Sequence, residues 1–312
     1  MAFFSSAFHI SPFLLLIIGF CGGTMSAFYG IGGGWLITPV LNILGLPMPY
    51  AIGTSLVYIL ITSIFGTIRH SKLKNISFII GIIIGVSALG GILIGKRIIL
   101  YLERQGSVDT YVRILYIFFL SAVGTYMLFE KKHNYKSAQN TKKRLIIPPV
   151  LHIRNNVNQV INISLITMLL IGFFIGFLQS TMGIGGGFVL LPILIYFLKF
   201  PVTLSIGTSL FSVLIVGFQG AAVYIVLHKI DWRSILYMIF TTIIGTYLGS
   251  SATKRINPDK IKILFAITVL CGAFAVLFKQ LDFRLISNIV IFSVAIFSTL
   301  AIIYSSFIKK AK

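Results

Sequence analysis

The sequence predicts an all-α protein that crosses a membrane several times and consists of two inverted repeats. Three observations lead to this fold class. Residues of the hydrophobic class make up 57% of the chain and charged residues only 10%, whereas soluble proteins carry about 25% charged residues. The apolar residues form blocks of about 18–25 residues, the length that crosses a bilayer as a helix. The same short sequence motifs also occur in the same order in each half of the chain.

These motifs indicate an internal duplication. Residues 30–41 read GIGGGWLITPVL, and residues 183–194 read GIGGGFVLLPIL. The pentapeptide IGTSL follows in both halves, at 52–56 and at 206–210. Two identical pentapeptides in register are not expected of unrelated apolar segments, so we infer two copies of one ancestral unit.

The duplication divides the chain into four parts. We predict a first membrane repeat at 12–129, a basic linker at 130–164, a second membrane repeat at 165–279 and an additional C-terminal transmembrane helix at 284–308. The linker is polar, contains Pro148-Pro149 and is expected to be flexible. The segment from Met1 to Gly23 has no Lys or Arg before its apolar core, so we expect it to be retained rather than cleaved as a signal peptide.

Each repeat begins with two short apolar blocks that meet at a glycine cluster, and three longer blocks follow. If each short pair returns to its starting side, 18 Lys and Arg lie on one side of the membrane and 8 on the other; a single crossing gives 14 and 12. The positive-inside rule favours the first arrangement, with inverted halves and with the linker and the C-terminus in the cytoplasm. The count does not separate a re-entrant pair from a spanning hairpin.

The positions of the acidic residues bear on the substrate. All six lie in loops or at block ends: Glu103, Asp109, Glu130, Asp231, Asp259 and Asp282. Cation sites and proton relays usually need a carboxylate inside the membrane. The pattern therefore argues against a cation transporter or a proton pump and is compatible with an anionic substrate.

The glycine clusters supply complementary chemistry. A helix that starts after such a cluster presents free backbone N–H groups and the positive end of its dipole, which bind anions. Gly/Pro-interrupted segments at matching places in two halves indicate a transporter binding site, although close helix packing through small residues is the alternative. The candidate substrate-binding residues are Gly32, Gly33, Gly34, Thr54, Ser55, Gly185, Gly186, Gly187, Thr208 and Ser209. Gln179 and Gln219 are weaker candidates, for which a helix contact is favoured.

The sequence gives no support for catalysis, a metal or a cofactor. GGILIGKR at 90–97 ends in Arg97 where a nucleotide-binding loop needs Ser or Thr. The five histidines have no metal-ligand spacing, and Cys21 and Cys271 lie alone in apolar blocks. The basic residues stand in loops between apolar blocks, which indicates topology and lipid headgroups rather than nucleic acid as the cause of the positive charge.

The paired GIGGG-x5-P segments, each followed by IGTSL, resemble the sulfite exporter TauE/SafE family of membrane permeases, a group that includes toluene-sulfonate uptake permeases. The resemblance covers roughly 12–129 and 165–279. It implies a multi-pass protein of the bacterial inner membrane that transports a small anion such as sulfite, sulfoacetate or another organosulfonate. The long linker and the block at 284–308 depart from shorter members.

Two classes of function stay open at this point. The first is a secondary transporter, either a permease or an exporter, of a small oxyanion or organosulfonate. The second is a membrane-embedded assembly factor or enzyme, which would be expected to show intramembrane ionisable residues. A passive anion channel is a further alternative.

Overall fold

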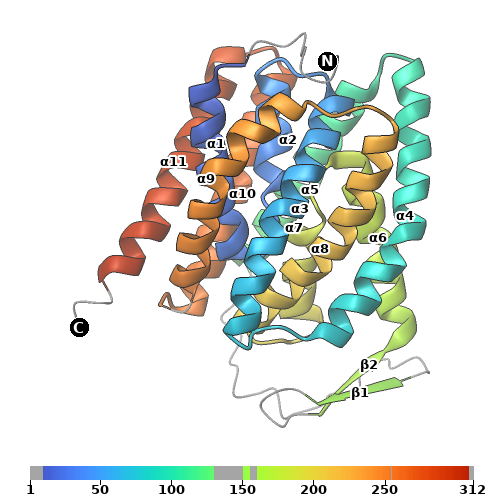
Figure 1. The fold of residues 1–312 in the computed structure, drawn as a ribbon, viewed down its shortest axis with the longest axis vertical. Helices are drawn as coiled ribbons and strands as arrows, with labels where there is room; N and C mark the ends of the chain where they lie inside the picture. Colours follow the sequence, from blue (N-terminus) through green and yellow to red (C-terminus); the bar gives the residue numbers. More distant parts are fainter. Residues whose placement is uncertain (1–9, 130–149, 155–159, 254, 309–312) are drawn as a thin grey trace.

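A computed structural model describes residues 10–129, 150–154, 160–253 and 255–308. In these ranges the chain is almost entirely helical (Figure 1). The helices of the first half are α1 (Pro12–Tyr29), α2 (Gly34–Ile43), α3 (Met48–Lys72), α4 (Phe78–Arg104) and α5 (Val108–Phe129). Those that follow are α6 (Leu165–Met182), α7 (Gly187–Pro192) with the π-helical turn η3 (Ile193–Phe197), α8 (Val202–Val226), α9 (Trp232–Thr253), α10 (Pro258–Gln280) and α11 (Arg284–Ile308).

The prediction of an all-α protein with several membrane-spanning helices is confirmed, and the inverted relation of the two repeats stays a prediction. Within the described ranges, nine helices are long and apolar enough to cross a membrane, while Gly34–Ile43 and Gly187–Phe197 are shorter apolar helices. The predicted additional C-terminal helix is α11, whose bounds coincide with the predicted block. The start of the N-terminal segment, residues 1–9, lies outside the described residues.

A short hairpin departs from the all-helical expectation. Strand β1 (Val150–Arg154) pairs with β2 (Val160–Ser164) in antiparallel register, with Val150 opposite Ser164. Both strands fall within the stretch predicted as a flexible linker, of which 130–149 and 155–159 lie outside the described residues. β2 runs directly into α6, where the Ser164 side chain accepts a hydrogen bond from the Thr167 N–H and caps the helix.

Figure 1 shows how the elements run between the two ends of the bundle. α1 starts at the upper end and α2 returns toward it, whereas β2 leads into α6 at the lower end, where α11 also finishes. The described part of the linker and the end of α11 thus lie toward the same end of the bundle. Which end faces the cytoplasm stays a prediction.

The two halves contact each other through pairs of helices, one helix from each half. α1 packs along α9 and α6 packs along α4, while α3 meets α8 and α5 meets α10. When the halves are aligned on their shared motifs, α1 corresponds to α6 and α4 to α9, so the first two contacts are copies of each other. Equivalent contacts of this kind are expected of two repeats related by an approximate two-fold axis.

Small residues allow these close contacts. A Cβ on Gly91 of α4 would collide with the carbonyl oxygen of Phe173 on α6, and one on Gly249 of α9 would collide with that of Thr24 on α1. On the α1 side, hydroxyls also bind across the contact: the Thr242 Oγ1 donates to the Gly19 carbonyl at 3.0 Å. Small residues and hydroxyls at helix contacts are typical of membrane proteins, where lipid supplies no hydrophobic force between helices.

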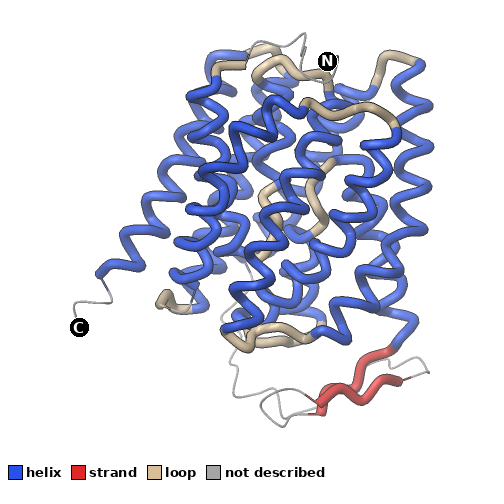
Figure 2. Tube along the Cα trace, viewed as in Figure 1, coloured by secondary structure: helices blue, strands red, loops and turns tan. Residues whose placement is uncertain are grey.

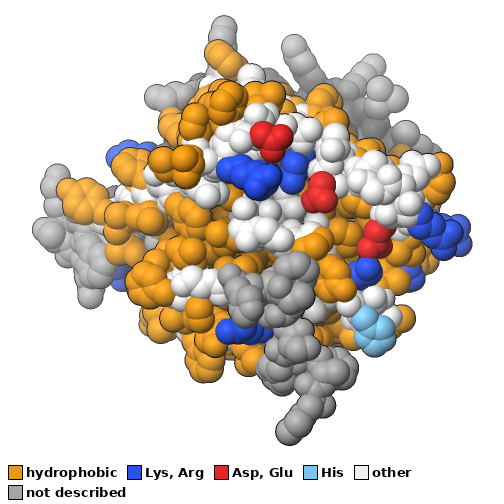
Figure 3. All heavy atoms as spheres, turned by 90° about the horizontal axis from the view of Figure 1, so that it is seen from above, with side chains coloured by type: hydrophobic (Ala, Val, Ile, Leu, Met, Phe, Trp, Pro, Cys, Tyr) orange, Lys and Arg blue, Asp and Glu red, His pale blue; other side chains and the backbone are white. Residues whose placement is uncertain are grey.

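The charges and the apolar surface are separated as a bilayer requires. Seen from above, charged side chains of both signs gather near the middle of the end face, with hydrophobic side chains around them (Figure 3). Many large apolar side chains are exposed along the sides of the bundle, among them Phe118, Phe218 and Phe240. In water such a surface would be unstable, but in a membrane it faces lipid.

Candidate functional site

Two loops interrupt the helices in the interior of the bundle, well away from both ends (Figure 2). They join α1 to α2 and α6 to α7, at the two glycine clusters. Six of their glycines have positive φ, at Gly30, Gly32, Gly33, Gly183, Gly185 and Gly186. Only glycine adopts this left-handed region without strain, so the repeated GIGGG sequence is what lets each helix stop and restart inside the protein.

The two loops contact each other directly. A Cβ on Gly34 would lie 2.5 Å from the Gly183 carbonyl oxygen, and one on Gly187 would lie 2.6 Å from the Ile31 Cα. No side chain therefore fits between these backbones. The starts of α2 and α7 therefore lie close together in the fold.

Two aliphatic side chains flank the contact. Ile59 on α3 and Val213 on α8 are fully buried, and both lie near Gly32 and Gly185. Counting from IGTSL, Ile59 and Val213 are equivalent positions in the two repeats. They close the space beside the glycine loops, and neither was identified from the sequence.

The loops carry backbone donors that the protein leaves unpaired. The N–H groups of Gly32, Gly33, Gly34 and Trp35 have no acceptor among the described residues, and the same holds for those of Gly185, Gly186, Gly187 and Phe188. The next N–H groups are paired: those of Leu36 and Ile37 bind the Gly33 carbonyl. Buried N–H groups without an acceptor are rare because each costs about 1–3 kcal/mol.

Thr54-Ser55 and Thr208-Ser209 are equivalent Thr-Ser pairs in the two repeats, and the first pair contacts a glycine loop through Ser55. The Ser55 Oγ donates to the Gly183 carbonyl oxygen at 2.9 Å, and the Thr38 Oγ1 lies 3.0 Å from the same oxygen. The equivalent Ser209 Oγ lies 3.5 Å from the Gly187 carbonyl oxygen. Ser55 and Thr38 thus hold the second loop in place, and Thr38 gave no signal in the sequence because its equivalent is Leu191.

The threonines of the two pairs, Thr54 and Thr208, bind backbone groups outside the glycine loops. The Thr54 Oγ1 accepts a hydrogen bond of 2.9 Å from the Asp231 N–H, just before α9. The Thr208 Oγ1 accepts one of the same length from the Ser77 N–H, just before α4. Each threonine therefore caps a helix start in the other repeat, and the structure does not bring these two hydroxyls to the glycine loops. Their part in substrate binding stays a prediction.

Side chains from other helices bind the carbonyl groups that the broken helices leave unpaired. The His70 ring Nε2 lies 3.0 Å from the Ala27 carbonyl oxygen, and the Tyr224 hydroxyl donates to the Ser180 carbonyl oxygen at 2.8 Å. Tyr116 donates in the same way to the Met182 carbonyl oxygen at 2.8 Å. His70 and Tyr224 occupy equivalent positions in the two repeats. A position-by-position comparison of the repeats would have identified them from the sequence.

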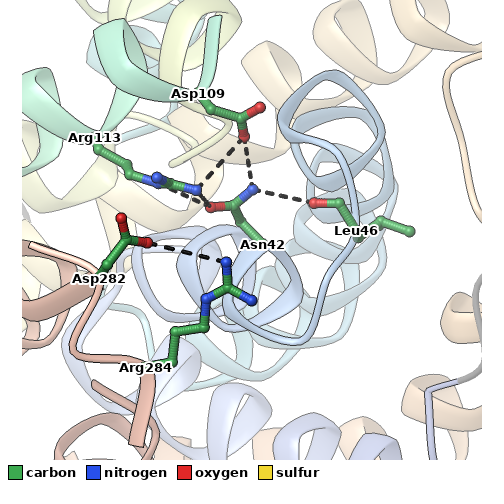
Figure 4. Close-up of polar contacts among 6 residues, drawn as sticks. All are labelled: Asn42, Leu46, Asp109, Arg113, Asp282 and Arg284. Atoms are coloured by element: carbon green, nitrogen blue, oxygen red, sulfur yellow. Dashed lines mark hydrogen bonds and ion pairs between the residues drawn. The ribbon is translucent and has the colours of Figure 1, made fainter. Parts of the chain in front are cut away.

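The far end of α2 is held by a polar network (Figure 4). The Asn42 Nδ2 donates to the Asp109 carboxylate at 2.8 Å and to the Leu46 carbonyl at 3.1 Å. The Arg113 guanidinium donates to the Asn42 Oδ1 at 3.0 and 3.2 Å. Because Asp109 and Arg113 stand at the start of α5, the network fixes the end of α2 opposite to its glycine loop.

Helices of membrane-spanning length around two facing broken helices define a multi-pass membrane protein of the transporter class. The sulfite exporter TauE/SafE family model matches residues 15–276. The chain therefore belongs to this family, a family of membrane transporters, and the resemblance inferred from the glycine clusters is confirmed.

Named relatives agree with this class. The chain is 28% identical to a "Probable membrane transporter protein" of Methanocaldococcus jannaschii over 81% of its own length and 90% of the relative. It is 23% identical to one from Bacillus subtilis, covering 82% and 94%, and 27% identical to one from Haemophilus influenzae, covering 85% and 98%. No solved structure matches the chain.

Proposed function

We propose that the chain is a secondary permease or exporter of a small anion, with sulfite, an organosulfonate or a related oxyanion as substrate, in the inner membrane of a bacterial cell. The observation that carries this proposal is the set of unpaired N–H groups on the two facing glycine loops. An oxyanion beside the loops supplies the acceptors that these N–H groups lack among the described residues.

The electrostatics of the site suit release as well as binding. The loops offer partial positive charges from backbone N–H groups and from the N-terminal ends of α2 and α7, and no full ionic partner. Several such donors together bind an anion without trapping it in an ion pair. A membrane transporter needs this property because its substrate must leave on the other side.

The site is closed in this conformation. Gly32, Gly33 and Gly34 are buried, as are Gly185, Gly186 and Gly187, and Ile59 and Val213 fill the space beside them. The substrate therefore reaches the loops only after the surrounding helices move.

Transport into proteoliposomes tests the proposal. Labelled sulfite and a labelled sulfonate are offered to vesicles that contain the purified full-length chain, with and without an imposed proton gradient. We expect saturable uptake that unlabelled sulfite competes with and metal cations or amines do not. Uptake of cations or amines with no effect of sulfite, sulfonates or carboxylates would contradict the anion proposal.

A further inference from the structure

The two glycine loops are alike in backbone but differ in the side chains beside them. The register of the repeats pairs Ser26, four residues before Gly30, with Gln179, four residues before Gly183. It pairs Ser63, eleven residues after Ile52, with Gly217. The first loop therefore has two hydroxyls where the second has an amide and no side chain.

Both hydroxyls lie against the first loop and have no partner. Ser26 and Ser63 are 0% exposed, and neither Oγ has a hydrogen-bond partner among the described residues. The Ser63 Oγ lies 3.6 Å from the position of a Cβ on Gly32, and the Ser26 Cβ lies 3.4 Å from that of a Cβ on Gly33. They stand beside the same stretch of backbone whose N–H groups are unpaired.

The second loop has no hydroxyl at the positions equivalent to Ser26 and Ser63. The Gln179 Nε2 already donates to the Val216 carbonyl at 2.7 Å, and what Gln179 leaves unpaired is its Oε1, an acceptor that repels an anion. At the position of Ser63, Gly217 offers no side chain at all. The helix behind the second loop is also shorter in regular α geometry: α7 has 6 residues before the π turn, and α2 has 10.

We propose that the charged oxygen atoms of the substrate bind at the first glycine loop, with the hydroxyls of Ser26 and Ser63 donating beside the N–H groups of Gly32 to Trp35. This assignment rests on the proposed function and deepens it, because it makes the site asymmetric within a symmetric fold. Six neutral donors then surround one oxyanion, and Ser26 and Ser63 determine its affinity.

The test measures sulfite and methanesulfonate binding to the purified full-length chain by calorimetry, for the wild type and three single variants. Ser63→Ala and Ser26→Ala each remove one hydroxyl and are expected to weaken binding about tenfold to a hundredfold, the usual effect of losing a hydrogen bond to a charged group. Ser212→Ala is the matched control, because Ser212 is equally buried and its Oγ already donates to the Thr208 carbonyl at 3.0 Å.

A transplanted hydroxyl tests the asymmetry. A Cβ on Gly217 meets its nearest atoms at 3.5 and 3.6 Å, which is ordinary contact, so Gly217→Ser fits the fold. In the Ser63→Ala background, Gly217→Ser is expected to leave binding weak, because the oxyanion does not bind at the second loop. Recovery of affinity in this double variant would overturn the asymmetric site.

The remaining outcomes separate this inference from the proposed function. If the wild type binds sulfite and both serine variants bind as Ser212→Ala does, the serines are not donors and the permease proposal stands without them. If the wild type binds neither anion and transports neither, both proposals fail.

Discussion

Replacing Gly33 by Leu is the most direct test of the glycine loops. Gly33 has φ +82°, and a Cβ there would lie 3.0 Å from the Gly22 carbonyl oxygen and 3.2 Å from the Tyr58 ring. A left-handed conformation costs a non-glycine residue about 1–2 kcal/mol. Overpacking in a buried site adds about 1–3 kcal/mol. The sum is roughly 2–5 kcal/mol, a large part of the stability of a folded protein.

The control is Gly106→Leu. Gly106 has φ +69°, so it carries the same backbone strain, but a Cβ there has no neighbour within 4 Å. The two variants therefore differ in crowding and in their place relative to the site. Each is purified, its folded fraction is measured by size-exclusion chromatography and thermal unfolding, and sulfite uptake is then compared per folded molecule.

We expect Gly106→Leu to transport as the wild type does and Gly33→Leu to lose transport per folded molecule. Gly186→Leu, at the equivalent loop with φ +70°, is expected to behave as Gly33→Leu does. Normal transport by Gly33→Leu at normal expression would refute the reasoning, because the loop backbone would then not approach the substrate.

Three further predictions follow from the same structure. Cysteines introduced in 130–164 or at Lys312 are expected to escape membrane-impermeant reagents applied to intact cells, and labelling of either region would contradict the inverted topology. Thr54→Val removes the acceptor of the Asp231 N–H and is expected to cost about 1–3 kcal/mol in thermal unfolding; weaker anion binding at unchanged stability would instead place Thr54 in the site. Ile59→Ala opens space beside both loops and is expected to raise passive anion leakage from loaded vesicles, at about 2–5 kcal/mol of stability. A folded Ile59→Ala protein with unchanged leakage would show that Ile59 does not close the passage.

Much of the fold can be predicted from the sequence because a bilayer restricts the structures that can cross it. Apolar blocks of spanning length must be helices, since lipid offers no partners for backbone N–H and carbonyl groups. The repeated GIGGG and IGTSL motifs gave the duplication and placed both helix breaks. Only glycine tolerates consecutive left-handed residues, so a backbone requirement is written directly in the residue type.

The sequence predicted only part of the surroundings of the two glycine loops. Gly32 and Gly185 fall in the loops, as expected, because both have a positive φ that glycine adopts without strain. Thr54 binds a helix start in the other repeat, whereas Ser55 binds the Gly183 carbonyl. The two residues are adjacent and equally polar, so the sequence does not distinguish these roles. Ser26 and Ser63 are ordinary serines in apolar helices, whose hydroxyls usually bind their own helix.

What the sequence by itself determined is therefore what single residue types and their periods encode: a membrane protein of two repeats, broken twice at glycine, with no carboxylate inside its apolar blocks. The tertiary structure alone decided which groups face which. It brought Gly34 against Gly183, placed Ile59 and Val213 beside both loops and left the hydroxyls of Ser26 and Ser63 without a partner among the residues that the structure describes. These contacts join residues that are far apart in the chain, and they depend on how helices of the two repeats pack, a relation that no local pattern carries.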